Sequence, residues 1–326
     1  MPADRSFEIV QPGLATTVQD RGRFGYYNVG IPQGGSLDQY SAELANALVG
    51  NTDGEALLEC AYMGPVLRAR APMDVAVTGA PIPVKVNGTE APSWSRLSLA
   101  DGDELSFGYI RGGARFYLAF SGGIDVPLVL GSRSTYPLGG LGGFQGRPLA
   151  AGDVVPVGAP RTAPALDSVA PEYRPEFARE QQVRVMLGLY DHRLTERGLA
   201  NLTQEEWSLT PVADRAGFRY DGPGVEWRER VQPFGAGSDP SNIVDAGYAV
   251  GSIQIPGGTQ PIVLHRDAVS GGGYAMVATV ISADMDLVAR AAPGTKTRFL
   301  PVDLEQALAA RNERKNRLSS AIAALG

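Results

Sequence analysis

Frequent turn residues constrain the fold of this chain more than any other feature of its sequence. The 326 residues include 41 glycines and 24 prolines, about a fifth of the chain against the ~12% usual in proteins. They separate short apolar runs such as Val75–Thr78 and Val84–Val86. The pair Asn87-Gly88, directly after the second run, suits a type I′ hairpin. Short strands joined by tight turns predict a mainly β fold.

The length predicts two domains, because a single hydrophobic core rarely extends through a chain of more than 300 residues. Residues 161–182 carry Pro164, Pro171 and Pro175 among mixed charges, without a sustained apolar period, which is typical of a linker. We therefore predict an N-terminal domain at residues 1–160, a linker at 161–182 and a C-terminal domain at 183–326.

Two segments are predicted to be helical. In Ser36–Val49, apolar residues fall three and four positions apart, Ser36 is a candidate N-cap and Gly50 a left-handed stop. A closing helix is predicted from near Asp303, a second N-cap candidate. Because residues 311–317 are polar, this helix is expected to lie on the surface.

Composition excludes several classes of function. A net charge of −6 argues against nucleic acid as a partner, since phosphate binding needs a basic surface. Cys60 is the only cysteine, so neither an intramolecular disulfide nor a thiolate metal cluster can form. The N-terminus lacks the apolar core of a signal peptide, and no apolar run approaches the ~20 residues of a membrane span. We expect a cytoplasmic protein without a membrane partner.

The sequence lacks the residue patterns that several kinds of chemistry require. There is no G-x-x-x-x-G-K-[ST] phosphate loop. The two histidines, His192 and His265, lie far apart in sequence, and a structural role is favoured over a metal ligand or triad member. None of the lysines, Lys85, Lys296 and Lys315, lies between the methionines typical of a biotin attachment site. No covalent biotin and no metal site are expected on this chain.

Two glycine-flanked clusters in the first half could bind a ligand. Gly131–Thr135 (Gly-Ser-Arg-Ser-Thr) combines a guanidinium, three hydroxyls and a flexible backbone, the parts of an oxyanion cradle. The alternative is a surface loop whose arginine pairs with a carboxylate. Gly139–Phe144 (Gly-Gly-Leu-Gly-Gly-Phe) is either a loop that folds over a ligand or a structural Ω-loop.

Two further clusters lie in the second half. Asp214 and Arg215 are adjacent and must each find a partner elsewhere, in the core or on a ligand. Asp267–Tyr274 places a carboxylate, a hydroxyl and a phenol around three glycines. Because strands tolerate glycine poorly, we expect this segment to form a backbone-lined pocket wall.

A series of longer motifs occurs in the order typical of one family. They are Thr17–Gly25 (TVQDRGRFG), Gly30–Asp38 (GIPQGGSLD), Asn46–Asn51 (NALVGN), Val77–Ala80 (VTGA), Tyr117–Ile124 (YLAFSGGI), Gly131–Thr135 (GSRST), Gly251–Pro256 (GSIQIP) and Pro293-Gly294. From about Phe7 to Val302 the chain resembles the family of KipA, the C subunit of 5-oxoprolinase and the second subunit of allophanate hydrolase, whose members also form half of the carboxyltransferase domain of urea carboxylase.

The resemblance implies two cyclophilin-like β-barrel domains and a role as one subunit of an ATP-dependent hydrolase of a cyclic amide or urea-type C–N bond. It implies ATP as cofactor, with or without Mg²⁺, bound in the complex. It also implies a KipI-like partner (the B subunit of 5-oxoprolinase), a LamB-like protein (the A subunit) and a small-molecule amide substrate. The alternatives are a regulatory protein that sequesters a KipI-like kinase inhibitor, and the carboxyltransferase half of a biotin-dependent urea carboxylase-like system.

Site residues follow from the matching motifs. The resemblance assigns catalytic roles to Arg133, which would hold a transferred phosphoryl or carboxylate group, to Asp267, which would orient substrate or water, and to Gln254, which would hold an amide. Substrate or anion contacts are expected from Ser134, Thr135, Asp214, Arg215, Ser270, Gly272, Gly273 and Tyr274. The chain departs from the family at Val269 and Ser270, where relatives commonly have Gln-Thr, and at Arg290, where they have Gln.

Overall fold

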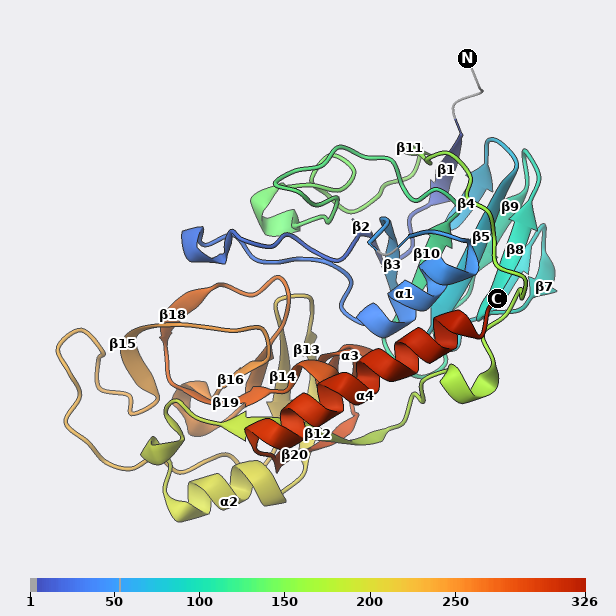
Figure 1. The fold of residues 1–326 in the computed structure, drawn as a ribbon. Coiled ribbons are helices and arrows are strands. Elements are labelled where there is room, and N and C mark those ends of the chain that lie inside the picture. The colour runs from blue at the N-terminus through green and yellow to red at the C-terminus, as the bar shows by residue number, and fades with distance from the viewer. Residues whose placement is uncertain (1–4, 53) are drawn as a thin grey trace. The chain divides into compact units, whose positions relative to one another are not determined.

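The computed structural model describes residues 5–52 and 54–326 and confirms a mainly β chain with few helices (Figure 1). The chain divides into two compact units. Unit 1 contains Met1–Phe24, Gly34–Phe177 and Lys315–Gly326, and unit 2 contains Gly25–Gln33 and Ala178–Arg314. Most of the segment expected as a linker therefore packs within unit 1, as do the last residues of the chain.

Unit 1 is built on two antiparallel sheets. The six-stranded sheet has the order β11(Val154–Pro156), β1(Ser6–Gln11), β4(Val66–Ala69), β9(Glu104–Phe107), β6(Val84–Val86), β7(Thr89–Ala91), and the five-stranded sheet the order β2(Ala15–Gln19), β3(Leu57–Ala61), β10(Arg115–Phe120), β5(Met73–Gly79), β8(Ser95–Leu99). Apolar side chains of both sheets form one core, for example Phe7, Val75 and Phe116. Asn87 and Gly88 both have positive φ between β6 and β7, which confirms the predicted turn.

Helix α1(Gln39–Leu48) explains why strand β10 is apolar throughout. All six residues of β10 are buried, because α1 packs on the face of the sheet opposite the core, with Leu44 and Leu48 near Tyr117. The helix was predicted, but its N-cap is Asp38 instead of Ser36. The Asp38 carboxylate accepts a hydrogen bond from the N–H of Ser41 at 3.1 Å.

Unit 2 contains a closed seven-stranded barrel. Its order is β12(Glu180–Leu187), β19(Met276–Val280), β16(Ser252–Gln254), β17(Ile262–Leu264), β14(Gly217–Asp221), β13(Trp207–Ala213), β20(Lys296–Pro301), and the parallel pair β20 and β12 closes it. Two further strands, β15(Asn242–Gly247) and β18(Gly271–Tyr274), pair only with each other. We call this two-stranded sheet the ribbon.

The remaining elements are short except for the last helix. They are α2(Glu196–Gln204), α3(Met285–Arg290), α4(Leu304–Ala323) and the 3₁₀ turns η1(Tyr27–Val29), η2(Pro137–Gly139), η3(Pro171–Tyr173), η4(Asp191–Arg193), η5(Pro256–Gly258) and η6(Ser282–Asp284). Asp303 caps α4 as predicted: its carboxylate accepts from the N–H of Gln306 at 2.8 Å, and Gln306 Oε1 accepts from the N–H of Asp303 at 3.0 Å. Most of α4 is exposed.

Candidate functional site

An internal carboxylate occupies the loop that was expected to cradle an anion. Asp20 accepts hydrogen bonds from the Ser132 hydroxyl at 2.7 Å, from the Ser134 hydroxyl, and from the N–H of Arg133 at 2.5 Å. The N–H of Gly22 donates to the same carboxylate at 2.7 Å. Residues 131–135 thus have the donors of an anion site, and the anion they hold is the protein's own Asp20. We call this arrangement the Asp20 loop.

Ser134 and Thr135 are enclosed by the fold. Both residues are 0% exposed, and the Thr135 hydroxyl donates to the carbonyl of Val18 at 2.9 Å. The Arg23 guanidinium reaches the same loop and donates to the carbonyl oxygens of Val129 and Ser134, each at 3.0 Å. These contacts give both hydroxyls a structural role, and the structure does not present them to a ligand.

Arg133 is held by its own loop. Its Nε donates to the carbonyl of Val126 at 2.8 Å, and its Nη2 lies 3.3 Å from Asp125 Oδ1. The Arg133 side chain is 27% exposed and that of Asp125 is 63% exposed. An arginine paired with a carboxylate is the alternative that the sequence left open for this cluster.

The glycine-rich loop borders a cavity beside Arg133. The N–H of Gly143 donates to the carbonyl of Arg133 at 3.0 Å, and a Cβ at Gly142 would lie 2.1 Å from the carbonyl oxygen of Ser134. This close approach explains the glycine. The cavity has a volume of about 380 Å³ and is lined mainly by apolar and glycine residues, with Asp125 and Gln145 as its polar lining residues. Its size is within the range of small-molecule sites.

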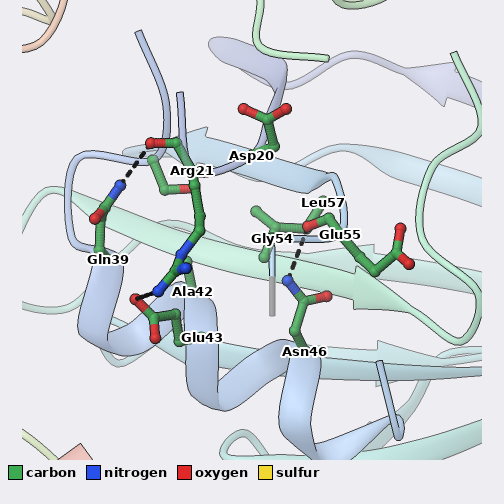
Figure 2. A pocket seen from close by; sticks show the side chains of 10 residues that line it. Asp20, Arg21, Gln39, Ala42, Glu43, Asn46, Gly54, Glu55 and Leu57 are labelled. Atoms are coloured by element: carbon green, nitrogen blue, oxygen red, sulfur yellow. Dashed lines mark hydrogen bonds and ion pairs between the residues drawn. The ribbon is translucent and has the colours of Figure 1, made fainter. Parts of the chain in front are cut away.

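A second cavity in unit 1 is too small for a substrate. Figure 2 shows Asp20, Arg21, Glu43 and Asn46 among its walls, with Arg21 Nη2 3.7 Å from a Glu43 carboxylate oxygen. Asn46 Nδ2 donates to the carbonyl of Glu55 at 2.9 Å (Figure 2). The space left for solvent is about 10 Å³, room for one water at most.

Two of the predicted site residues in unit 2 pair with each other. Arg215 Nε and Nη2 donate to the two carboxylate oxygens of Asp267 at 2.8 and 2.9 Å, and the N–H of Asp267 donates to the carbonyl of Arg215 at 2.9 Å. Asp267 is 5% exposed. Asp214 instead accepts from the N–H groups of Ala216 and Gly217 within its turn. The Arg215–Asp267 pair therefore joins two turns of the barrel and uses both carboxylate oxygens.

Tyr248 brings the other predicted residues of unit 2 together. Its hydroxyl donates to the carbonyl of Tyr274 at 2.9 Å and accepts from the Tyr274 N–H at 2.7 Å, while its own N–H donates to the carbonyl of Ser270 at 2.8 Å. A Cβ at Gly272 would lie 3.1 Å from the Tyr248 ring. The expectation that three glycines disfavour a strand was wrong: residues 271–274, Gly273 included, form strand β18. At Gly272 the Tyr248 ring occupies the space that a side chain would need.

Gln254 is buried with an unused donor. Its strand partners, Ile262 and Met276, belong to an apolar cluster that includes Tyr248. Directly paired residues share one face of a sheet, so Gln254 lies on the barrel face that this cluster covers. Gln254 is 5% exposed, and its Nε2 has no acceptor within residues 5–52 and 54–326. Burial of Tyr248 raises the pKa of its phenol, which remains a neutral donor there.

The histidines show no catalytic arrangement. His265 is fully buried, its Nδ1 accepts from the N–H of Arg266 at 2.9 Å and its ring lies 5.5 Å from that of Phe218. These contacts hold the His265 ring in the core of unit 2. Among the residues that the structure describes, no three His, Cys, Asp or Glu side chains gather closely enough to hold a metal, and no helix has the length and apolar character to span a membrane.

Three residues of these clusters had no predicted role: Asp20, Tyr248 and Arg193. Asp20 stood in a recognised polar motif, but its partners Ser132, Arg133 and Ser134 are more than a hundred positions away. Tyr248 directly follows Gly247, and this glycine is the only local feature of the sequence that indicates the end of a strand there. Arg193 stacks on Tyr190, with its guanidinium carbon 4.4 Å from the ring centre, a contact that no spacing rule predicts.

The chain belongs to a known family. The model of the carboxyltransferase domain, subdomains A and B, matches residues 29–301. A putative urea carboxylase of Emericella nidulans is 32% identical over 97% of this chain and 26% of that protein. The C subunit of the 5-oxoprolinase of Escherichia coli is 31% identical over 94% of this chain and 95% of that protein.

A solved structure has the same fold. The urea amidolyase of K. lactis superposes with a TM-score of 0.91 and 31% sequence identity, over 97% of this chain and 20% of that one. The chain therefore spans about a quarter or less of the urea carboxylase and amidolyase relatives, but nearly the whole of the 5-oxoprolinase C subunit.

Proposed function

We propose that this chain is the carboxyltransferase-type subunit of a complex that uses ATP to open a small cyclic amide. The observation that carries the proposal is the 31% identity to the C subunit of Escherichia coli 5-oxoprolinase along 95% of that protein. Gln254 supports it, because a buried carboxamide with an unused N–H suits an acceptor oxygen of the substrate.

The reaction converts 5-oxoproline, ATP and water to glutamate, ADP and phosphate. Phosphorylation of the lactam oxygen by ATP makes the ring carbon electrophilic enough for one water to attack. The C–N bond then breaks as the nitrogen takes up a proton, which gives an acyl phosphate, and a second water hydrolyses this acyl phosphate to the carboxylate and phosphate. The part of this chain is to position the lactam and stabilise charge on its oxygen. ATP, with or without Mg²⁺, binds in the assembled complex.

The partners we propose are a KipI-like protein, equivalent to the B subunit of 5-oxoprolinase, and a LamB-like protein, equivalent to the A subunit. Support comes from the names of the relatives, since a protein named as one lettered subunit of an enzyme implies further subunits. Co-expression with such proteins should yield one peak containing this chain in size-exclusion chromatography at micromolar concentration. Separate peaks would contradict a stable complex.

Activity tests the proposal directly. We expect 5-oxoproline-dependent ATP hydrolysis and glutamate formation by the complex, and loss of both when this chain is omitted. Equal activity without it would show that the chain is not part of the catalytic machinery.

A second candidate is the carboxyltransferase half of a urea carboxylase-like system. The TM-score of 0.91 with the K. lactis urea amidolyase favours it. This activity would need biotin on another chain. Bicarbonate- and urea-dependent ATP hydrolysis that requires a biotinylated carrier protein would support the second candidate, and an avidin-insensitive reaction with 5-oxoproline would support the first.

A further inference from the structure

Several buried polar side-chain atoms of unit 2 have no hydrogen-bond partner in the described part of the chain, the Ser252 hydroxyl among them. They include three N–H donors, Gln254 Nε2, Trp227 Nε1 and Arg193 Nε. Buried polar groups are nearly always paired, because a buried group without a partner loses its hydrogen bonds to water and gains none in return. Because all three atoms are donors, the missing partner is an acceptor.

Contacts connect Gln254 with Arg193. Met276 is a strand partner of Gln254, and its carbonyl accepts from the N–H of Tyr190 at 3.0 Å. The Arg193 guanidinium stacks on the Tyr190 ring, and its Nη1 donates to the carbonyl of Asn242 in the ribbon at 3.2 Å. Both donors thus lie along the junction of barrel and ribbon.

A second set of contacts connects Arg193 with Gln254 through Trp227. Leu194, next to Arg193, forms a β-bridge with Trp227. A Cβ at Gly258 would lie 3.1 Å from Trp227 Nε1, so the indole nitrogen packs on the turn that begins two residues after Gln254. These two series of contacts place Arg193, Trp227 and Gln254 in the same part of unit 2.

The immediate surroundings of the Arg193 guanidinium include a second guanidinium, that of Arg230. Burial, and then repulsion from Arg230, lower the pKa of Arg193. Within the ranges that the structure describes, neither arginine forms an ion pair with a carboxylate. Two neighbouring guanidiniums without a counter-charge favour an anionic ligand.

We propose that Arg193, Trp227 and Gln254 form a binding site for a small oxyanion. Arginine supplies a charge-assisted hydrogen bond, and the indole and carboxamide supply neutral N–H donors. The inference rests on the proposed function where the oxyanion is the carboxylate of the cyclic amide. A phosphoryl group of the nucleotide offers the same acceptor chemistry.

Calorimetric titration of the purified full chain distinguishes a substrate carboxylate from a phosphoryl group as the bound oxyanion. The probes are 5-oxoproline, 2-pyrrolidone (the same lactam without the carboxylate) and inorganic phosphate. We expect 5-oxoproline to bind and 2-pyrrolidone not to bind; binding of phosphate alone would assign the site to a phosphoryl group. If no probe binds, or if 2-pyrrolidone binds as well as 5-oxoproline, the oxyanion site is wrong.

Two variants test whether the ligand binds at these residues. Arg193→Gln should weaken binding of the oxyanion by at least about tenfold, the effect of losing a charge-assisted hydrogen bond. Gln254→Leu should also weaken binding, while the melting temperature stays the same or rises, because an unpaired buried donor is removed from an apolar cluster. A merely structural Gln254 would instead lower the melting temperature on substitution.

Arg298→Gln is the matched control. Arg298 is an exposed residue of β20, a strand of the same barrel that does not pair with β16, so the variant removes one charge without touching the proposed site. Binding should remain within about twofold of wild type. Loss of binding in this variant equal to that of Arg193→Gln would reduce the effect to net charge and overturn the site. Because binding is measured on the chain alone, its outcome is independent of turnover by the complex.

Discussion

The Asp20 loop and the junction of barrel and ribbon both gather hydrogen-bond donors, but only the Asp20 loop contains the acceptor for them. In the Asp20 loop, two hydroxyls and two N–H groups converge on one carboxylate of the same chain. At the junction, the donors of Arg193, Trp227 and Gln254 have no acceptor among the described residues. The donors of the Asp20 loop are satisfied by the chain itself, and those at the junction need the acceptor of a ligand.

This difference shows what a sequence motif can and cannot establish. Serine, threonine and arginine around a glycine indicate that an anion is bound, and the Gly131–Thr135 motif does surround one. Whether that anion is a substrate or an aspartate more than a hundred residues away depends on tertiary contacts. A count of donors and acceptors in the folded chain decides between them.

Removal of the internal anion should have the largest effect. Asp20→Ala leaves the hydroxyls of Ser132 and Ser134 and the N–H of Arg133 without their acceptor. We expect the free energy of unfolding to fall by about 3 kcal/mol, since each buried unpaired group costs about 1–3 kcal/mol. Urea denaturation with a constant m value would measure this loss.

Asp125→Ala is the control for that experiment. Its carboxylate is also bonded to the loop, through Arg133, but its side chain is 63% exposed. An exposed ion pair contributes about 0–1 kcal/mol, so this variant should lose little stability. Equal losses in the two variants would show that Asp20 is not the organising group of the loop.

Local patterns predicted much of the fold. The alternation of apolar runs and turns indicated the β class, the Asn87-Gly88 pair indicated the β6–β7 hairpin, and Asp303 indicated the start of α4. The helix after Ser36 was predicted with the wrong cap, because Ser36 and Asp38 are both good caps and the choice depends on the fold. Such signals act over a few residues and need no tertiary information.

The sites were predicted less well because their chemistry is decided by distant partners. Arg215 and Asp267 were assigned separately to a ligand, but they satisfy each other across 52 positions. Gln254 was assigned through the resemblance, and only the structure shows that its donor is unused. Arg193 and Trp227 belong to no motif that the sequence offered, so only their contacts identify them.

An intermediate effect is expected in the ribbon. Tyr248→Phe removes the hydroxyl that bonds both the N–H and the carbonyl of Tyr274. We expect a loss of about 1–2 kcal/mol, and faster hydrogen exchange confined to residues 242–247 and 271–274. Exchange that rises equally throughout the barrel would mean that the ribbon is not a separate local unit.

The smallest effect is expected at Arg133, and it contrasts the two regions most directly. Arg133→Lys keeps the charge and can keep one of the two contacts, to Asp125 or to Val126. Because the guanidinium is held by its own loop, we expect a stability change of about 0.5 kcal/mol and less than about a threefold change in 5-oxoproline-dependent ATP hydrolysis by the complex. Gln254→Leu in the same assay should lose at least about tenfold.

The ratio of these two turnover losses tests the assignment of the reacting group. If Arg133→Lys melts normally but loses more than tenfold in turnover, at least about 1.4 kcal/mol of transition-state stabilisation came from the two-pronged donor geometry of arginine. The anion anchor would then be Arg133, beside the cavity of about 380 Å³ in unit 1, and its contact with Asp125 would be a resting-state pair that substrate replaces. If stability and turnover fall together, Arg133 is a structural residue, and the donors at the junction remain the candidates for substrate recognition.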